Sequence, residues 1–397
     1  MQITLKAEEK LKQRLKEDIE SLRSPEGYLY AGIPKFMGLF GRDALISAWE
    51  LLEYDPKIAK DTLIALSNIQ GKRVDKNTGE EPGKIPHEYY PEYTSEAWYK
   101  ENKKEVKWLK KGAPVYFSID ATLLFVIIFA KYFSVTGDYQ TFQKLWPSVK
   151  AAIDWLVVYG IRDEFVKHEK LDPEKGLEFH SWKDGLGDPV NQLNGRIAVV
   201  EVQGYAYLAY RETARLAGVM GEKTLKNDLL GRAENLKKNF GEKFWMPDKK
   251  YFAFGFDDNR KMIKSIMSNP GHLLFTGIID RDRADIVVKR LFAPEMWTRY
   301  GIRTHAVTEP DFDPYAYQLG AVWLHDNWVI AQGLKKMGYV QEYKKVIDAM
   351  LLAAEALCIT PELYGVTTDQ KIFTEDLLSS PCYPQAWSCA AVLSILS

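Results

Sequence analysis

Apolar residues recur at helical spacing through most of the 397-residue chain. In 42–54, for example, Leu45, Trp49 and Leu52 fall on one face of a helix. Strand-like alternation is rare, and we expect hairpin arms only at 176–183 and 249–256. The pattern predicts helices over 5–23, 42–54, 56–70, 118–135, 138–159, 197–217, 221–240, 271–279, 281–292, 319–337, 340–357 and 384–396.

Several helix ends carry their own sequence signals. Asp55 precedes Pro56, which predicts an N-cap followed by proline in the first turn. Ser118 is expected to cap the helix that ends before Gly137. The Trp146-Pro147 step predicts a break or restart, because proline lacks a backbone N–H.

Long connections follow alternate helices, and in compact domains such loops are usually functional. They cover 71–116, 161–196, 241–270, 293–318 and 358–383. Neither a low-complexity linker nor a short repeat is seen, which favours one domain over 1–397 and argues against a solenoid. We expect an all-α (α/α)6 barrel with its long loops at one mouth, and residues 1–30 packing on it as an N-terminal helix.

Charge and cysteine usage exclude several functional classes. The net charge is −1 and no strong basic patch occurs, so a nucleic-acid partner is not expected. The three cysteines form no CxxC pair, which excludes a zinc site or disulfide framework but leaves one bridge from Cys382 to Cys358 or Cys389 open. The charged N-terminus and short apolar runs predict a cytoplasmic protein without membrane contact. No metal or organic cofactor is implied, and the oligomeric state stays open.

The loops concentrate aromatic, acidic and histidine side chains beside glycines. Each loop alone is explained by turn and cap chemistry, and the 11 Trp, 22 Tyr and 18 Phe could simply build a large core. Together they are typical of a polar cleft for a neutral, hydroxyl-rich ligand. The segments are 38–43, 84–90, 176–188, 268–272, 300–305, 322–328, 361–365 and 383–388.

Nine segments, taken in order, resemble a known enzyme family. The segments read GLFGRDALIS, YFSIDATLLF, GLEFHSWKDG, EVQGYAYLA, SNPGHLL, GIRT, GAVWLHDN, PELYG and PQAWS. They resemble the amylo-α-1,6-glucosidases, the C-terminal catalytic domains of glycogen-debranching enzymes. The resemblance covers roughly 30–397 and overlaps with family 15 glucoamylases and glycoside hydrolase family 63. It implies an (α/α)6 barrel that hydrolyses glycosides with inversion.

Inversion requires one protonated and one ionised carboxyl group, separated by about 6.5–9.5 Å so that a water fits between them. The resemblance places the acid at Asp184, in the Trp182-Lys183-Asp184 segment, and the base at Glu362 in PELYG. Burial beside Trp182 would raise the pKa of Asp184, and we expect the Lys183 amine to point elsewhere. The rivals are Asp188 for the acid, and Glu309 and Glu375 for the base.

The remaining site residues are candidates for binding the sugar. Arg42 and Asp43 match a family pair that holds hydroxyls of the terminal sugar, although they could form an ordinary salt bridge. Asp120 is either a helix cap or a ligand. Further substrate-binding candidates are His87, Glu88, Trp182, Lys183, Glu201, Gln203, His272, Trp323, His325, Asp326 and Trp387.

Two departures from the family pattern leave the substrate open. Leu324 stands where the family has proline, and Phe179-His180-Ser181 replaces Asn-Gln-Gly before the acid. We expect an exo-acting hydrolase that releases glucose from small or oligomeric α-1,6- or α-1,4-glucosides. The alternatives are a family 63-type hydrolase of glucosylglycerate or mannosylglycerate, a non-catalytic sugar-binding barrel, and an epimerase using His272 and His305.

Overall fold

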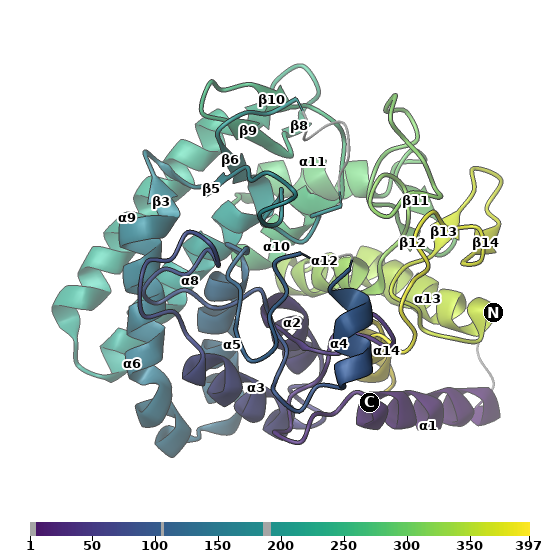
Figure 1. Ribbon diagram of the computed structural model, residues 1–397. Coiled ribbons are helices and arrows are strands. Elements are labelled where there is room, and N and C mark those ends of the chain that lie inside the picture. The colour runs from purple at the N-terminus through teal and green to yellow at the C-terminus, as the bar shows by residue number, and fades with distance from the viewer. Residues whose placement is uncertain (1–4, 105–106, 186–191) are drawn as a thin grey trace.

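The computed structural model describes residues 5–104, 107–185 and 192–397 (Figure 1). Helices dominate this part of the chain, and short strands lie in the connections between them. The α-helices are α1 Leu5–Ser21, α2 Gly41–Glu50, α3 Pro56–Asn68, α4 Glu96–Asn102, α5 Ala121–Thr136, α6 Tyr139–Trp155, α8 Val200–Val219, α9 Lys223–Lys243, α10 Leu273–Thr276, α11 Arg281–Leu291, α12 Leu324–Met337, α13 Val340–Leu357 and α14 Ala386–Leu396.

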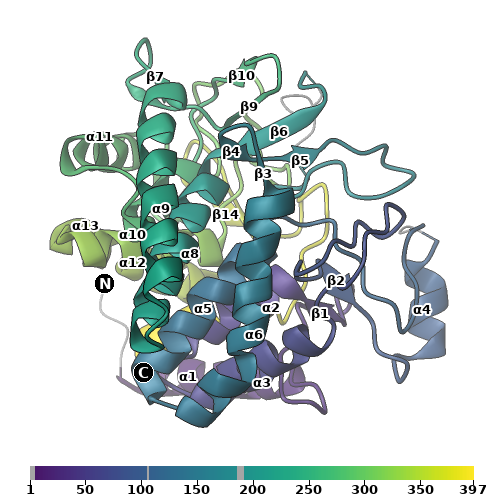
Figure 2. The same ribbon diagram turned by 90° about the vertical axis from the view of Figure 1, so that its left-hand side faces the viewer.

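The inner helices of the described chain form a closed ring. Each packs on the next in the order α2, α5, α8, α10, α12 and α14, and α14 returns to α2. A second layer surrounds this ring, with α1 against α14, α3 against α2 and α5, α6 against α5, α9 against α8, α11 beside the start of α10, and α13 against α12 (Figures 1 and 2). The predicted (α/α)6 barrel is therefore confirmed.

The two layers differ in their apolar patterns because they differ in burial. Helix α5 is apolar on almost every face and buries most of its side chains inside the ring. Helix α9 buries one stripe, Leu229, Ala233, Leu236 and Phe240, at the spacing of an amphipathic helix. One continuous core joins both layers and includes Leu15 and Ile19 of α1.

The two mouths of the ring are unlike. Outer helices connect to the following inner helices through long segments, whereas inner helices turn back through short ones such as 137–138 and 338–339. All strands of the described chain lie in the long segments, so they gather beside the N-terminal ends of the inner helices. Segment 292–323 leads from α11 to α12, and 358–385 leads from α13 to α14.

The strands are short and antiparallel. The main sheet has the order β10-β9-β6-β5, with Ile197 of β6 opposite Asp257 of β9. The other strands form two-stranded pairs. Their bounds are β1 Leu39–Phe40, β2 Glu88–Tyr89, β3 Ile161–Arg162, β4 Phe165–Val166, β5 His168–Glu169, β6 Arg196–Val199, β7 Trp245–Met246, β8 Tyr251–Phe252, β9 Gly255–Asp257, β10 Met262–Ile263, β11 Trp297–Thr298, β12 Gly301–Ile302, β13 Gly365–Val366 and β14 Ile372–Phe373.

Several predicted boundaries were right and others wrong. The Asp55 carboxylate caps α3 by accepting from the Lys57 N–H at 3.1 Å, as expected. The break at Pro147 is wrong, because α6 runs through it and ends in a π-turn at Leu156–Gly160. Asp120 rather than Ser118 occupies the N-cap of α5, although the Ser118 hydroxyl accepts from the Ala121 N–H at 3.2 Å.

Other corrections concern the long segments. Helix α12 begins at Leu324, because 319–320 forms a turn and Val322 forms bridges with Arg303 and Tyr364. The expected hairpin arm at 176–183 contains no strand, whereas 249–256 contributes β8 and the start of β9. Helix α4 lies inside a segment expected to be loop (Figure 2). The three cysteines are free, so the bridge left open by the sequence does not form.

Candidate active site

The predicted site residues gather where the inner helices begin. Every inner helix of the described chain places at least one of them in or beside its first turn. Backbone N–H groups at helix N-termini carry partial positive charge, which favours the carboxylates found there. The residues are Arg42 and Asp43 on α2, Asp120 before α5, Glu201 on α8, His272 before α10, His325 and Asp326 on α12, and Trp387 on α14.

Arg42 ties the predicted acid to the start of α5. Its Nε donates to Asp120 Oδ2 at 2.7 Å, and its Nη1 donates to Asp184 Oδ2 at 3.3 Å. The Ser118 hydroxyl donates to Asp120 Oδ1 at 2.6 Å. Asp120 thus occupies the N-cap position of α5 without a side-chain cap hydrogen bond, and its two oxygens accept from Ser118 and Arg42. Its role is to hold the guanidinium that faces Asp184.

Asp184 remains accessible although its neighbours are buried. Its side chain is 22% exposed, against 3% for Arg42 and 1% for Asp120. Burial raises the pKa of the Asp184 carboxyl, and the nearby Arg42 charge only partly opposes this rise. A proton can therefore be retained to a higher pH than on an ordinary aspartate, at an oxygen that substrate can reach.

Glu362 occupies a more enclosed position. Its Oε2 accepts from the Cys382 backbone N–H at 3.0 Å, and its Oε1 accepts from the Tyr317 hydroxyl. Burial raises the pKa of Glu362 to about 7, while these two hydrogen bonds lower it. Two donors aimed at one carboxylate favour its ionised form, which is the form that a general base requires.

The charges of both predicted catalytic groups act on Asp43. Burial raises its pKa to about 8, and the charges of Asp184 and Glu362 add to that rise. The charge of Asp184 also raises the pKa of Glu362. The Tyr317 ring lies against Gly185 and its hydroxyl donates to Glu362, so the fold brings the segment of Asp184 close to Glu362, although the two residues are far apart in the chain.

Aromatic rings form a wall behind Asp184. The Trp182 ring lies parallel to His272, with centroids 6.0 Å apart, and edge-on to His325 at 4.8 Å. His325 in turn stacks on Trp387 at 3.8 Å. Trp323 closes the group edge-on to Trp182 at 5.8 Å. All five rings are buried, so they fix Trp182 beside the acid and leave little ring face for a sugar.

Lys183 points away from the acid that follows it, as expected. Its Nζ donates to the Thr304 carbonyl at 2.6 Å, and burial lowers the pKa of this amine to about 7. The contact anchors the acid segment to the connection before α12. Lys183 is thus placed as an anchor rather than as a sugar ligand.

The β2 segment borders the same space. The Trp108 indole N–H donates to Glu88 Oε1 at 2.9 Å, and the charge of Asp184 contributes to the raised pKa of Glu88. Burial and the charge of Arg42 lower the pKa of His87. Both candidates from the 84–90 segment therefore lie near the Arg42–Asp184 pair.

A polar chain runs beneath the wall. The Tyr205 hydroxyl and His272 Nδ1 lie 2.5 Å apart, and His272 Nε2 lies 2.7 Å from Asp326 Oδ1. Glu201 is buried nearby, and the charge of His272 partly offsets the rise in its pKa caused by burial. These residues support the site from below and do not reach its open side.

Gln203 does not belong to the site. Its amide oxygen accepts from the Val166 N–H, and its amide nitrogen donates to the Val166 and Val199 carbonyls, all at 2.9 Å. These contacts use the whole side chain to fasten β4 to α8. The position two residues after Glu201 places Gln203 on another face of the helix, which the motif alone did not reveal.

The rival residues lie elsewhere. The Glu309 carboxylate holds Lys249 Nζ at 2.9 Å and the Ile266 N–H at 3.0 Å, so it is a structural group. Glu375 is exposed on the loop after β14. Asp188 lies outside the described residues. His305 Nε2 lies 2.8 Å from Asp311, while His272 holds Asp326, so the two histidines of the epimerase alternative serve different carboxylates.

Sequence reasoning missed two residues that contact the catalytic segments. Tyr317 holds Glu362, and Gln318 contacts the backbone on both sides of Lys183 and Asp184. The sequence could have indicated them only through their position, because they lie just before the Gly320–Trp323 motif. The polarity of Tyr317 and Gln318 does not distinguish them from residues of an ordinary loop.

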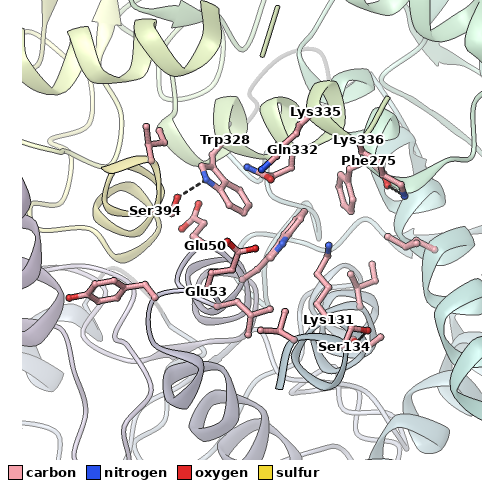
Figure 3. A pocket seen from close by; sticks show the side chains of 18 of the residues that line it. Glu50, Glu53, Lys131, Ser134, Phe275, Trp328, Gln332, Lys335, Lys336 and Ser394 are labelled. Atoms are coloured by element: carbon pink, nitrogen blue, oxygen red, sulfur yellow. Dashed lines mark hydrogen bonds between the residues drawn. The ribbon is translucent and has the colours of Figure 1, made fainter. Parts of the chain in front are cut away.

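A cavity of about 940 Å³ lies at the opposite mouth of the ring (Figure 3). Its lining includes Trp49 and Lys131, near the C-terminal ends of α2 and α5, and Trp328 of α12. The Lys131 amine lies 4.3 Å from the Trp49 ring, and burial lowers its pKa to about 8. None of the predicted catalytic residues lines this cavity, so it is distinct from the candidate active site.

Residues 5–104, 107–185 and 192–397 contain no cluster of three or more His, Cys, Asp or Glu side chains arranged to bind a metal ion. Among the helices of the same ranges, none is both long and apolar enough to cross a membrane.

Comparison with known proteins points to glycoside hydrolases. Residues 180–360 match the family described as the mannosylglycerate hydrolase MGH1-like glycoside hydrolase domain. This range contains Asp184 and ends just before Glu362. Mannosylglycerate hydrolase MGH1 of Selaginella moellendorffii is 33% identical over 73 residues, and mannosylglycerate hydrolase of Rubrobacter radiotolerans is 26% identical over 149 residues. The aligned parts span 15% and 33% of those two relatives.

Solved structures extend the likeness to nearly the full chain. The GH63 mannosylglycerate hydrolase from Thermus thermophilus, in complex with glucose, gives a TM-score of 0.73 at 15% identity. Its complex with Tris and D-glycerate gives 0.72 at 14% identity. Both matches cover 97% of this chain and 99% of the other. The chain therefore has the barrel fold of a GH63 mannosylglycerate hydrolase, and its central segment matches a glycoside hydrolase family.

Proposed function

We propose that this protein is an inverting α-glycoside hydrolase whose substrate is a small glycoside of glycerate. Mannosylglycerate is the leading candidate. The observation that carries the proposal is the position of Tyr317, whose hydroxyl donates to Glu362 while its ring lies against Gly185 beside Asp184. In addition, the charges of Asp184 and Glu362 both raise the pKa of Asp43. The family match over 180–360 and the mannosylglycerate hydrolases among the relatives support the substrate class.

In this mechanism Asp184 is the acid and Glu362 the base. The Asp184 carboxyl donates its proton to the glycosidic oxygen while the bond from that oxygen to the anomeric carbon breaks. Glu362 takes a proton from a water that attacks the anomeric carbon from the opposite face. Glycerate leaves as an alcohol, and the sugar is released with inverted anomeric configuration.

The surrounding residues position the proposed acid and base. Arg42 holds Asp184 in place and stays charged, while Asp43, with its pKa of about 8, is protonated at neutral pH. A protonated Asp43 donates a hydrogen bond to a sugar hydroxyl or to a neighbouring carboxylate. Tyr317 and the Cys382 N–H keep Glu362 oriented toward the attacking water.

A second candidate is the release of terminal glucose from α-1,6- or α-1,4-glucosides. The nine ordered segments that resemble amylo-α-1,6-glucosidases favour it. The two candidates share the acid and the base and differ in what the site accepts as the leaving group. Debranching and glucose release therefore stay predictions, ranked behind the glycerate glycosides.

One experiment tests both candidates and the roles of the carboxyl groups. The protein is incubated with mannosylglycerate, glucosylglycerate, isomaltose, panose and maltotriose, and the first-formed anomer is followed by NMR. We expect cleavage of a glycerate glycoside with inversion, and its loss in Asp184→Asn and Glu362→Gln. Retention of configuration, or cleavage by either variant at the wild-type rate, would refute the mechanism. Sugar binding without any cleavage would favour the non-catalytic barrel.

A further inference from the structure

Gln318 makes two hydrogen bonds that bracket the proposed acid. Its Nε2 donates to the Trp182 carbonyl at 2.7 Å, and its Oε1 accepts from the Gly185 N–H at 2.7 Å. One amide side chain thereby satisfies the backbone on both sides of Lys183 and Asp184, as a neighbouring strand would. Gln318 is itself buried, so water does not compete for these contacts.

The preceding residue reaches the proposed base. The Tyr317 hydroxyl donates to Glu362 Oε1, and the Tyr317 carbonyl accepts from the Trp323 indole N–H at 2.9 Å. Two consecutive residues thus contact the two segments that carry the catalytic carboxyl groups. Their own backbone is fixed to the start of α12 through Trp323. This dipeptide therefore links the segment of Asp184 to the Glu362 side chain.

The packing around the dipeptide is tight. A Cβ placed on Gly185 would come within 2.8 Å of the Tyr317 ring, so the acid segment and the Tyr317 ring are already in close contact. Lys183, which precedes Asp184, is anchored to the Thr304 carbonyl. The Thr304 hydroxyl accepts from the Gly320 N–H at 3.1 Å. The Lys183 and Gln318 side chains consequently fasten this segment to 304 and 318, in addition to the hydrogen bond from Arg42 to the Asp184 carboxylate.

We propose that Gln318 is a positioning residue that holds Asp184 at its working distance from Glu362. This inference rests on the proposed function, since it takes Asp184 as the acid. Gln318 touches neither the carboxyl group of Asp184 nor the reacting atoms, and it acts through the backbone of 182–185. Its loss should impair proton delivery more than sugar binding.

The first test replaces the amide by a chain of similar size without hydrogen-bonding groups. Gln318→Met is compared with Gln332→Met, which makes the same change at the opposite mouth of the ring (Figure 3). Displacing a catalytic group by about 1 Å can lower rates by about 10²-fold. We expect Gln318→Met to lower kcat on mannosylglycerate by about 10- to 100-fold with KM within about threefold of the wild-type value. Gln332→Met should match the wild type.

A substrate that needs little acid assistance separates positioning from general damage. With α-mannosyl fluoride the carbon–fluorine bond breaks, fluoride leaves without a proton, and Glu362 takes the proton of the attacking water. We expect Gln318→Met to lose much less activity on the fluoride than on the glycoside. If glucosides prove the better substrates, the glucosyl pair is used instead. Equal losses on both substrates would overturn the proposal, and so would an unchanged kcat.

Gln318→Glu provides a conservative variant whose activity should depend on pH. A protonated glutamate reproduces both hydrogen bonds, donating to the Trp182 carbonyl and accepting from the Gly185 N–H. An ionised glutamate places charge against that carbonyl. The activity of Gln318→Glu relative to wild type should therefore be highest at low pH and fall as pH rises. A pH-independent ratio would contradict the bracketing role.

Amide exchange keeps this inference separable from the hydrolase proposal. We expect the Gly185 amide to exchange at least about tenfold faster in Gln318→Met than in wild type, and the Cys382 amide to be unaffected. If wild type cleaves none of the substrates but this acceleration is found, the proposed function fails while the backbone role stands. If Gly185 exchange is unchanged, the positioning role is refuted whatever the activity.

Discussion

Removal of the Tyr317 hydroxyl should shift the pH dependence of the reaction in a defined direction. The hydroxyl donates to Glu362, whose pKa is raised by burial to about 7 and lowered by this hydrogen bond. Hydrogen bonds to charged groups contribute about 1.5–3 kcal/mol, and one pH unit corresponds to about 1.4 kcal/mol. Taking the lower figure, Tyr317→Phe should raise the pKa of Glu362 by about one unit.

The sign of the kinetic effect follows from the role of Glu362 as base. The base must be ionised, so activity is lost as pH falls through its pKa. With that pKa near 8 rather than about 7, the ionised fraction at pH 7 falls from about one half to about one tenth. We expect kcat/KM at pH 7 to decrease about fivefold through this effect alone.

The assay is kcat/KM against pH for wild type, Tyr317→Phe and a control, Tyr315→Phe. Tyr315 is partly exposed and packs on Phe373 at 4.7 Å, so its hydroxyl should not influence Glu362. We expect only Tyr317→Phe to move the acidic limb upward, by about one pH unit. An acidic limb that stays in place or moves downward would refute the assignment of Glu362 as the base held by Tyr317.

Three further predictions follow from the same geometry. Asp184→Asn and Glu362→Gln should each lower turnover by at least about 10²-fold, with urea midpoints near that of wild type; normal turnover would exclude the residue. Arg42→Lys should lower kcat by at least about tenfold, because one amine cannot bridge Asp120 and Asp184 as the guanidinium does; unchanged kinetics would show that this bridge is dispensable. Burial raises the pKa of the unpartnered Glu50 well above its usual value, so the native state retains a proton that the unfolded state loses above about pH 4.3. Glu50→Gln should therefore stabilise the protein by up to about 1.4 kcal/mol for each pH unit above that value and have no effect at about pH 4, which urea unfolding would check; a pH-independent difference would contradict the buried carboxyl.

The apolar pattern by itself determined the helices of the two ring layers and their order, but not α4. Spacing of three and four residues reports burial against one neighbour, so α9, α11 and α13 could be predicted from local sequence. The Asp55-Pro56 start and the Gly137 end were readable because caps are satisfied within a few residues. Alternating long and short connections were enough to predict a ring with its loops at one mouth.

Resemblance and local pattern also named most of the candidate site, because the motifs stand at the first turns of the inner helices. Local pattern could not distinguish Gln203, which fastens β4, from Glu201, which lies under the site on the same helix. It also gave no reason for α6 to continue through Pro147. The role of Gln203 depends on Val166, which is distant in sequence.

Only closure of the ring decided how the acid and the base meet. Asp184 and Glu362 lie in different connections, and these connections come together because the ring closes, with α14 packing back on α2. The contacts of Tyr317 and Gln318 arise from a third connection that the same closure brings beside them. Such contacts leave no periodic trace in the sequence, because hydrogen bonds between loops follow the three-dimensional path of the chain rather than the repeat of a helix.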